Sequence, residues 1–210
     1  TAWQEAAQPE GQTHFKGILE KISDLAKEID KPIIVKETGA GIAAEEAEKL
    51  EVAGVKAIDV SGVGGTSFAA VEYYRAKKRK NSFQRVLGDV FWDWGIPTAI
   101  SVAEVSQTVN VPVIASGGMR DGVDIAKALA LGASLASLSQ PALQAAIKGL
   151  KETENMLSSM IEELKNAMFL TGAESVKHLQ KVPIVITGKT AEWLKLRGFN
   201  LENYAKRRRN

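Results

Sequence analysis

Residues 113–121 read Val-Ile-Ala-Ser-Gly-Gly-Met-Arg-Asp, and this stretch contains the features that decide the fold. Its first three residues form a short apolar run of the kind found in a strand that is buried on both faces. Two consecutive glycines follow, and Asp121 is suited to cap a helix that starts at about Gly122. Backbone N–H groups at a glycine turn beside a helix N-terminus favour an anion. We therefore predict a strand, a phosphate-binding turn and a helix in this order.

The same order recurs along the chain. Short apolar runs at residues 33–36, 57–60 and 135–138 each end at a polar residue or a small residue, between stretches with helical spacing. Together with residues 113–115 they predict four parallel strands, each buried on both faces. A closed (β/α)8 barrel has eight such units in about 250 residues. We therefore predict an α/β fold of the TIM-barrel type, of which these 210 residues supply roughly the C-terminal half.

Helices are predicted around these strands. Apolar spacing favours helices at residues 18–29, 43–53 and 122–131, and a Met-rich stripe over 156–168 indicates a long helix that packs on the core. An insertion between the second and third strands is expected to form a helix, an exposed loop and another helix from about Thr98. Residues 206–209 are expected to be a frayed tail. The insertion carries a basic run with only Phe83 to stack on bases, which indicates a solvated surface: Arg75, Lys77, Lys78, Arg79, Lys80 and Arg85.

Composition excludes several classes of protein. The chain has 27 Lys and Arg against 25 Asp and Glu, so its net charge of +2 gives no sign of nucleic-acid binding. It has no cysteine, which excludes disulfides, thiolate metal sites and cysteine nucleophiles. No apolar run approaches the ~20 residues that span a bilayer. We expect a soluble cytoplasmic protein with no nucleic-acid or membrane partner.

Polar residues follow the predicted strands and are candidates for ligand binding. Lys36 ends the first strand, where a buried cation needs either the glutamate next in sequence or an anionic ligand as its partner. The loop after the second strand contains Ser61 and Thr66, whose hydroxyls suit either polar ligand atoms or the local backbone. Ser139 and Gln140 follow the fourth strand. Neighbouring strand ends that present amides to one phosphate are typical of barrel enzymes.

Two nucleotide-binding patterns compete with this interpretation. Gly39, Gly41 and Ala44 satisfy a G-x-G-x-x-A dinucleotide fingerprint, with Asp59 at a suitable distance onward. The fingerprint begins later after its strand than a Rossmann unit requires, and an NAD-binding domain is kept as an alternative. The Gly-Lys-Thr sequence at 188–190 lacks the upstream glycine of a P-loop and is rejected.

The N-terminal stretch supplies the remaining candidates. Gln4 and Glu5 precede a Gln-Pro-Glu-Gly sequence at residues 8–11. A carboxylate here suits Mg²⁺ shared with phosphate oxygens, and it equally suits an exposed loop. The histidines, His14 and His178, have no metal-ligand spacing, and neither follows a predicted strand.

The ordered set of motifs resembles the type 2 isopentenyl-diphosphate isomerases, an FMN-dependent family of isoprenoid biosynthesis. Each motif also occurs in other FMN barrels, and the order of the set is what points to this family. The motifs cover nearly the whole chain: Gln-Glu at 4–5, Gln-Pro-Glu-Gly at 8–11, Ile-Val-Lys-Glu at 34–37, Asp-Val-Ser-Gly-Val-Gly-Gly-Thr at 59–66, Trp-Gly-Ile-Pro-Thr-Ala at 94–99, Ala-Ser-Gly-Gly-Met-Arg at 115–120 and Ala-Met-Phe-Leu-Thr-Gly at 167–172.

The resemblance implies a TIM barrel with FMN over the C-terminal ends of the strands. It implies that Gln4 and Lys36 are catalytic, that Gln4 faces the substrate, and that Glu5 is the Mg²⁺ ligand that bridges to the substrate diphosphate. It assigns cofactor contacts to nine residues: Lys36, Ser61, Thr66, Gly117, Gly118, Met119, Arg120, Ser139 and Gln140.

The implied reaction moves the double bond of isopentenyl diphosphate to give dimethylallyl diphosphate. The resemblance implies that reduced FMN carries out the acid–base chemistry, with NAD(P)H as its reductant and no net redox change. A cation at Lys36 would stabilise an anionic reduced flavin, which agrees with this role.

The resemblance also divides the chain. We expect one region in which residues 1–14 form an active-site loop, 15–172 form βα units and 173–210 form a C-terminal extension. The family's N-terminal half is not in this sequence, so we expect the chain to need that half for catalysis. We also expect a homo-oligomer.

Rival functions are another FMN-dependent TIM-barrel oxidoreductase and a non-catalytic phosphate- or flavin-binding fragment. Inosine-monophosphate-dehydrogenase chemistry needs a cysteine, and 2-hydroxy-acid oxidases need a histidine at a strand end, so neither of these fits the sequence.

Overall fold

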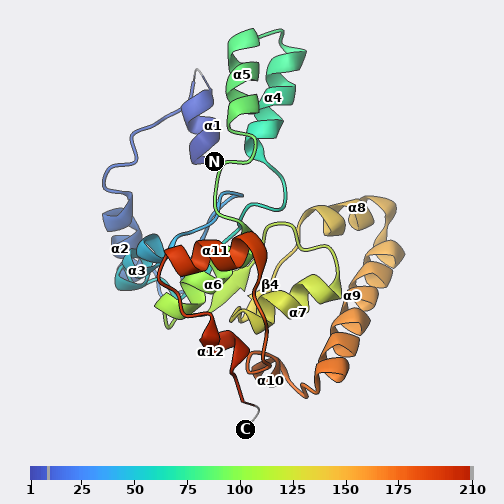
Figure 1. Cartoon of the computed structure of the whole chain (residues 1–210). Coiled ribbons are helices and arrows are strands. Elements are labelled where there is room, and N and C mark those ends of the chain that lie inside the picture. Colours follow the sequence, from blue (N-terminus) through green and yellow to red (C-terminus); the bar gives the residue numbers. More distant parts are fainter. Residues whose placement is uncertain (9, 209–210) are drawn as a thin grey trace.

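The computed structural model describes residues 1–8 and 10–208. Pro9 of the N-terminal motif and Arg209 of the predicted tail lie outside the described residues. The described chain forms a central parallel sheet with helices packed around it (Figure 1).

The sheet has four parallel strands that lie in the order of the sequence: β1 (Ile34–Lys36), β2 (Ala57–Asp59), β3 (Val113–Ala115) and β4 (Leu135–Ala136). Val35 pairs with Ile58, and Ile114 pairs with Leu135. This sequential order is that of a (β/α)8 barrel, whereas a Rossmann sheet reverses its strand order near the middle. The predicted barrel-type fold with roughly half of its strands is confirmed, and the NAD-domain alternative is wrong.

The prediction that every strand is buried on both faces holds only in the middle of the sheet. All three residues of β2 are buried, but Ile34 in β1 is 53% exposed and Leu135 in β4 is 59% exposed. The reason is position, because β1 and β4 are the edge strands and each has one neighbour among the described strands. Lys36, in β1, is therefore exposed rather than buried.

The predicted helices around the sheet are confirmed near their expected bounds: α2 (Ile18–Glu28), α3 (Ala44–Val52), α6 (Thr98–Thr108) and α7 (Gly122–Ala130). Helix α7 begins where predicted because the Asp121 side chain accepts the N–H of Asp124 at 2.8 Å. Helices α8 (Gln140–Lys148) and α9 (Leu150–Thr171) pack together, and α9 also packs on α7. Met160, in the Met-rich stripe of α9, is buried.

The insertion between β2 and β3 differs from its prediction. The expected exposed loop contains a helix, so that α4 (Phe68–Lys78) and α5 (Ser82–Val90) form a hairpin that projects from the body of the molecule (Figure 1). Asn81 caps α5 by accepting the N–H of Gln84 at 3.2 Å. A Cβ on Gly88 would lie 2.8 Å from the Tyr73 Cβ, so this glycine lets the two helices approach closely. The basic run of the hairpin is exposed, as expected of a solvated surface.

The C-terminal segment forms three short helices: α10 (Val176–Leu179), α11 (Gly188–Leu196) and α12 (Glu202–Ala205). Leu194 and Tyr204 are fully buried in the main core. The predicted frayed tail is wrong at Arg207, whose Nη1 donates to the Ala130 carbonyl at 2.5 Å and whose guanidinium stacks on the Tyr204 ring. The hydrogen bond satisfies a carbonyl group at the end of α7 that no helical N–H can reach.

The N-terminal segment, predicted as a loop, begins with helix α1 (Ala2–Ala7). The Thr1 side chain accepts the Gln4 N–H, and the Gln4 side chain accepts from Thr1 in return, which makes a capping box. The helix lies against the α4–α5 hairpin, where Gln84 donates to the Ala7 carbonyl at 3.1 Å. Within the described ranges, no helix combines the length and the apolar character that a bilayer crossing needs.

Candidate active site

The nine residues predicted to contact the cofactor line a single cavity of about 450 Å³. The cavity lies where the strands end, and each strand or the loop after it contributes: Lys36 from β1, Ser61 after β2, Gly117 after β3 and Ser139 after β4. The carboxyl ends of parallel strands meet at one edge, which is where ligands of barrel proteins bind. The lysine and the paired-glycine turn, far apart in sequence, are therefore neighbours in one cavity, which we call the cofactor cavity.

The paired-glycine turn offers free hydrogen-bond donors to this cavity. Gly117 has φ +103° and Gly118 has φ +88°, which only glycine adopts without strain. A Cβ on Gly118 would lie 2.3 Å from the Gly64 carbonyl oxygen, so the turn packs directly on the loop after β2. Among the described residues, the N–H groups of Gly117, Gly118 and Met119 have no acceptor. Three consecutive free amides fit an anionic group such as a phosphate.

The two loops that form the rear of the cofactor cavity are joined by Arg120. Its guanidinium donates to the Gly118 carbonyl at 3.1 Å and to the Gly64 carbonyl at 3.2 Å. The side chain is exposed and keeps donors that these two bonds do not use. Arg120 thus links the loops and leaves positive charge beside the free amides.

Lys36 has a different partner from the one considered in the sequence. Its Nζ donates to the Glu37 backbone carbonyl at 2.8 Å, whereas the Glu37 carboxylate faces away to other groups. An ammonium group has three donors, so this single bond leaves two for a ligand. Lys36 also lines a second, more open cavity, so it stands at the boundary between the two.

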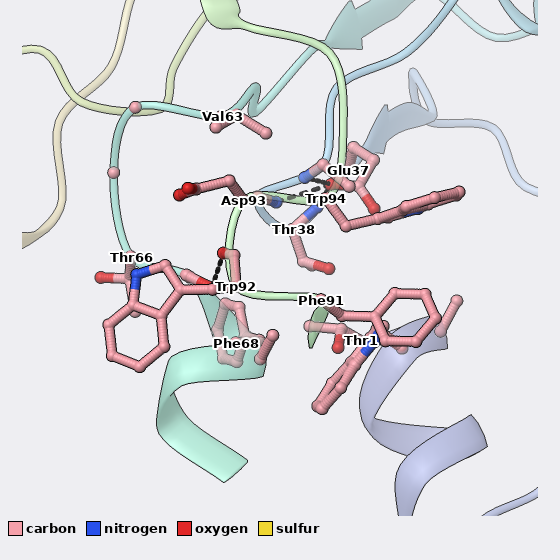
Figure 2. Close-up of a pocket in the computed structure, with 18 residues that line it drawn as sticks. Thr1, Glu37, Thr38, Val63, Thr66, Phe68, Phe91, Trp92, Asp93 and Trp94 are labelled. Atoms are coloured by element: carbon pink, nitrogen blue, oxygen red, sulfur yellow. Dashed lines mark hydrogen bonds between the residues drawn. The ribbon is translucent and has the colours of Figure 1, made fainter. Parts of the chain in front are cut away.

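The Glu37 carboxylate accounts for the glycine fingerprint that follows it. One of its oxygens accepts the N–H groups of Thr38, Gly39 and Ala40 at 2.5, 2.6 and 2.5 Å (Figure 2). These amides would have to bind a pyrophosphate in a dinucleotide site, but the protein's own anion already occupies them. The fingerprint therefore encodes a capped turn.

Ser61 sits in a strained position at the end of β2. Its φ of +35° is unusual for a residue with a side chain, and its N–H donates to the Asp59 carboxylate at 3.3 Å. Asp59 is buried and also accepts a short hydrogen bond from the Ser116 hydroxyl. Asp59 therefore joins the ends of β2 and β3 directly beneath the cofactor cavity.

A second cavity of about 380 Å³ adjoins the cofactor cavity (Figure 2). The two share Thr38, Gly39, Gly65, Thr66 and Phe68. Its wall is rich in aromatic rings, which come from α1, α4 and the segment after α5: Trp3, Phe68, Phe91, Trp92 and Trp94. We call it the aromatic cavity, and it suits an apolar group attached to a ligand in the cofactor cavity.

Gln4 and Glu5 lie on different faces of α1. The Gln4 amide donates to the Glu72 carboxylate at 2.6 Å, and Gln4 lines neither of these two cavities. Glu5 lines the open cavity of about 950 Å³ that also contains Lys36. The Glu5 carboxylate accepts the Gln12 N–H at 2.7 Å.

Glu72 is a buried carboxylate that the sequence did not single out. It accepts hydrogen bonds from Gln4 of α1, from Gln8 just after that helix and from Arg75 of its own helix. Burial raises the pKa of Glu72, but the three hydrogen bonds together lower it below its ordinary value of 4.5. The buried carboxylate therefore stays ionised and anchors α1 to the hairpin.

The described carboxylates and histidines do not form a metal site by themselves. Within the described ranges, no three His, Cys, Asp or Glu side chains gather closely enough to hold one. A single carboxylate fits Mg²⁺ only where phosphate or water oxygens complete the shell, as Mg²⁺ often requires. Glu5, which lines the open cavity, meets this condition.

Sequence reasoning missed four residues that shape the site: Glu37, Asp59 in its observed role, Glu72 and Thr98. Each has a polar side chain that makes hydrogen bonds. Glu37 binds the turn next to it, and the other three bind groups that are distant in sequence. Glu72 carried a weak signal, because a glutamate between Val71 and Tyr73 in an otherwise Ala- and Tyr-rich helix implies a partner.

Comparison with known proteins identifies the class. The family model of the FMN-dependent dehydrogenases matches residues 4–185, and the chain belongs to this family. An isopentenyl-diphosphate delta-isomerase of Pyrococcus furiosus is 53% identical over 98% of this chain and 51% of the relative. One of Methanothermobacter thermautotrophicus is 51% identical over 97% of this chain and 57% of the relative. The chain spans about half the length of the curated relatives it matches.

Solved structures agree on the fold. A lactate oxidase of Pediococcus acidilactici superposes with a TM-score of 0.65 at 23% identity, covering 86% of this chain and 43% of that chain. A mandelate oxidase carrying a monooxide FMN adduct superposes with a TM-score of 0.60 at 25% identity, covering 80% of this chain and 46% of the other.

Proposed function

We propose that the complete protein interconverts isopentenyl diphosphate and dimethylallyl diphosphate with bound reduced FMN and Mg²⁺. The observation that carries the proposal is the cofactor cavity, which is lined by all nine residues that the sequence resemblance assigns to flavin binding. The relatives that are 53% and 51% identical over nearly the whole chain are isopentenyl-diphosphate delta-isomerases, which supports this substrate.

The phosphate end of FMN is proposed to lie at the glycine turn. The free N–H groups of Gly117, Gly118 and Met119 would donate to its oxygens, with Arg120 beside them. Ser139 and Gln140, at the start of α8, add the positive end of that helix.

The ring end of FMN is proposed to lie toward Lys36. Bound there, reduced FMN would supply the acid–base group for proton exchange with the alkene. The Lys36 ammonium, with two donors to spare, would hold negative charge on the ring edge. The hydroxyls of Ser61 and Thr66, which line the same cavity, would fix the ring's polar atoms.

The substrate is proposed to extend from the cofactor cavity into its neighbours. Its five-carbon chain would pack in the aromatic cavity beside Phe68 and Trp92 (Figure 2), whose rings would exclude water from it. Glu5 would share Mg²⁺ with the diphosphate. Gln4 would act on the substrate side once its amide leaves Glu72, and NAD(P)H would supply electrons, both on the resemblance alone.

Further strands are proposed to complete the barrel. Among the described residues, no strand pairs with the outer edge of β1 or of β4. Ile34 and Leu135 are exposed at these edges, which supports pairing with strands that the 210 residues do not contain. We propose that turnover requires those strands, and that the protein is a homo-oligomer in the cytoplasm.

The experiment uses the complete protein, purified with its flavin. We expect it to be yellow and to convert isopentenyl diphosphate only after anaerobic reduction, with the product followed by chromatography. Protein stripped of flavin serves as the control and should recover activity when FMN is added back. Equal conversion without flavin would refute the proposal.

The rival oxidoreductase activity has less support. Hydroxy-acid oxidation needs a base at a strand end, and His14 and His178 are both exposed and line none of the three described cavities. Assays with lactate and mandelate test this alternative directly.

A further inference from the structure

Thr98, the first residue of α6, joins the two loops that form the rear of the cofactor cavity. Its N–H donates to the Val63 carbonyl at 3.1 Å, on the loop after β2. Its hydroxyl lies 2.7 Å from the Gly117 carbonyl oxygen, 3.3 Å from that of Ser116 and 3.4 Å from that of Val63. A hydroxyl has one hydrogen to donate, so the short contact with Gly117 is the bond that Thr98 makes.

The fit around Thr98 leaves no room for a side chain at the neighbouring glycines. A Cβ on Gly62 would lie 2.5 Å from the Thr98 Cα, and one on Gly117 would lie 2.7 Å from the Thr98 hydroxyl and 2.2 Å from the Gly62 carbonyl oxygen. Thr98 itself is buried. Three backbone segments therefore meet at one side chain, with glycines at the contact points.

The direction of the Gly117 carbonyl determines the direction of the next N–H. Among the described residues every peptide bond is trans, so the Gly117 carbonyl and the Gly118 N–H point to opposite sides of one plane. Thr98 holds the carbonyl on the protein side, which turns the Gly118 N–H away from Thr98. In the same way, the Gly62 N–H holds the Ser116 carbonyl at 3.0 Å and turns the Gly117 N–H outward.

We propose that Thr98 is a positioning residue that orients the Gly117–Gly118 peptide so that its N–H faces the phosphate of bound FMN. The proposal rests on the proposed flavin binding, and it concerns the phosphate end alone. Without the hydroxyl, the peptide loses the one side-chain partner that it has among the described residues, and a rotation of that plane withdraws the donor.

The test compares FMN with riboflavin, which lacks the phosphate. In the complete protein, Thr98→Val replaces the hydroxyl by a methyl group of similar size, and Thr98→Ser keeps the hydroxyl. Flavin dissociation constants are measured by fluorescence quenching on the flavin-free protein. We expect Thr98→Val to weaken FMN binding by about tenfold and to leave riboflavin binding unchanged, with Thr98→Ser close to wild type.

Each outcome has one meaning. Equal loss of FMN and riboflavin affinity in Thr98→Val, or no loss of either, overturns the positioning role. A wild-type protein that binds neither flavin refutes the proposed function instead. If Thr98→Val does not fold, a titration of wild-type protein with inorganic phosphate decides, because the Gly118 amide ¹H–¹⁵N signal must shift. A Gly118 signal that stays unchanged while other turn amides shift overturns the proposal.

Discussion

At the scale of single residues, the site depends on side chains that hold backbone groups in place. Glu37, Asp59 and Thr98 each fix a turn or a strand end beside the cofactor cavity. Lys36 is the exception, because its one backbone bond leaves most of its donors free. The residues that prepare the site and the residues that would touch a ligand are thus largely different.

Lys36 should contribute directly to the affinity for FMN. Lys36→Ala should raise the FMN dissociation constant about tenfold, because a charge-assisted hydrogen bond to the flavin is lost. Flavin release measured by absorbance after ultrafiltration checks this. Lys56→Ala removes another exposed lysine, beside β2, and should have no effect. Wild-type retention in Lys36→Ala would leave Lys36 with its bond to the Glu37 carbonyl as its only role.

At the scale of elements, two buried carboxylates attach helices to the body of the molecule. Glu72 holds α1 against the hairpin. Glu104 of α6 is buried and accepts from the Ala44 N–H of α3 and the Trp193 indole of α11. Arg197, just after α11, contacts Glu104 at 3.3 Å and exposed Glu45 at 2.6 Å. These contacts link elements that are distant in sequence.

Glu72 should make the docking of α1 depend on pH. Because the pKa of Glu72 is below its ordinary value of 4.5 in the folded protein, its stabilisation is complete above pH 4.5 and is lost as the pH falls through the lowered value. Glu72→Gln should therefore melt at a lower temperature than wild type at pH 7 and at the same temperature in strong acid. Melting curves across pH check this, with exposed Glu46→Gln as the control. A constant difference at all pH values would contradict it.

Glu104 and Glu45 provide a matched pair of carboxylates around Arg197. Glu104→Gln should lower the free energy of unfolding by about 3 kcal/mol, because donors from α3, α11 and Arg197 lose the buried carboxylate that accepts from them. Glu45→Gln should leave the urea midpoint unchanged, because solvent screens that exposed pair. Urea unfolding curves measure both. Equal effects of the two substitutions would show that the buried network adds nothing specific.

The hairpin shows where prediction from sequence stops at this scale. Strand β2 was predictable because Ala57 and Ile58 belong to a short apolar run between segments with helical spacing. Helix α5 was not, because Gly88 disfavours a helix by its own propensity and is used for the close approach to Tyr73. The helix propensity of a single residue does not include the stabilisation that arises when two helices pack together.

At the scale of the whole molecule, the sequence predicts the sheet, its parallel direction and the edge at which the nine candidate residues gather. Those features follow from four apolar runs that end in polar loops. The burial of each strand could not be predicted from these runs. The exposure of Ile34, for example, depends on which strands lie next to β1. Likewise, the bond from Thr98 to Gly117 requires knowing which loops meet.

The positions of Thr1 and Arg207 have a practical consequence. Thr1 lines the aromatic cavity, whereas Arg207 is held at the C-terminal end of α7, on the face away from the glycine turn where that helix starts. A fluorophore or surface tether placed beside Arg207, on exposed Lys206, would leave the three described cavities clear. The same label at Thr1 would put foreign atoms in the mouth of the aromatic cavity and report on steric hindrance instead of chemistry.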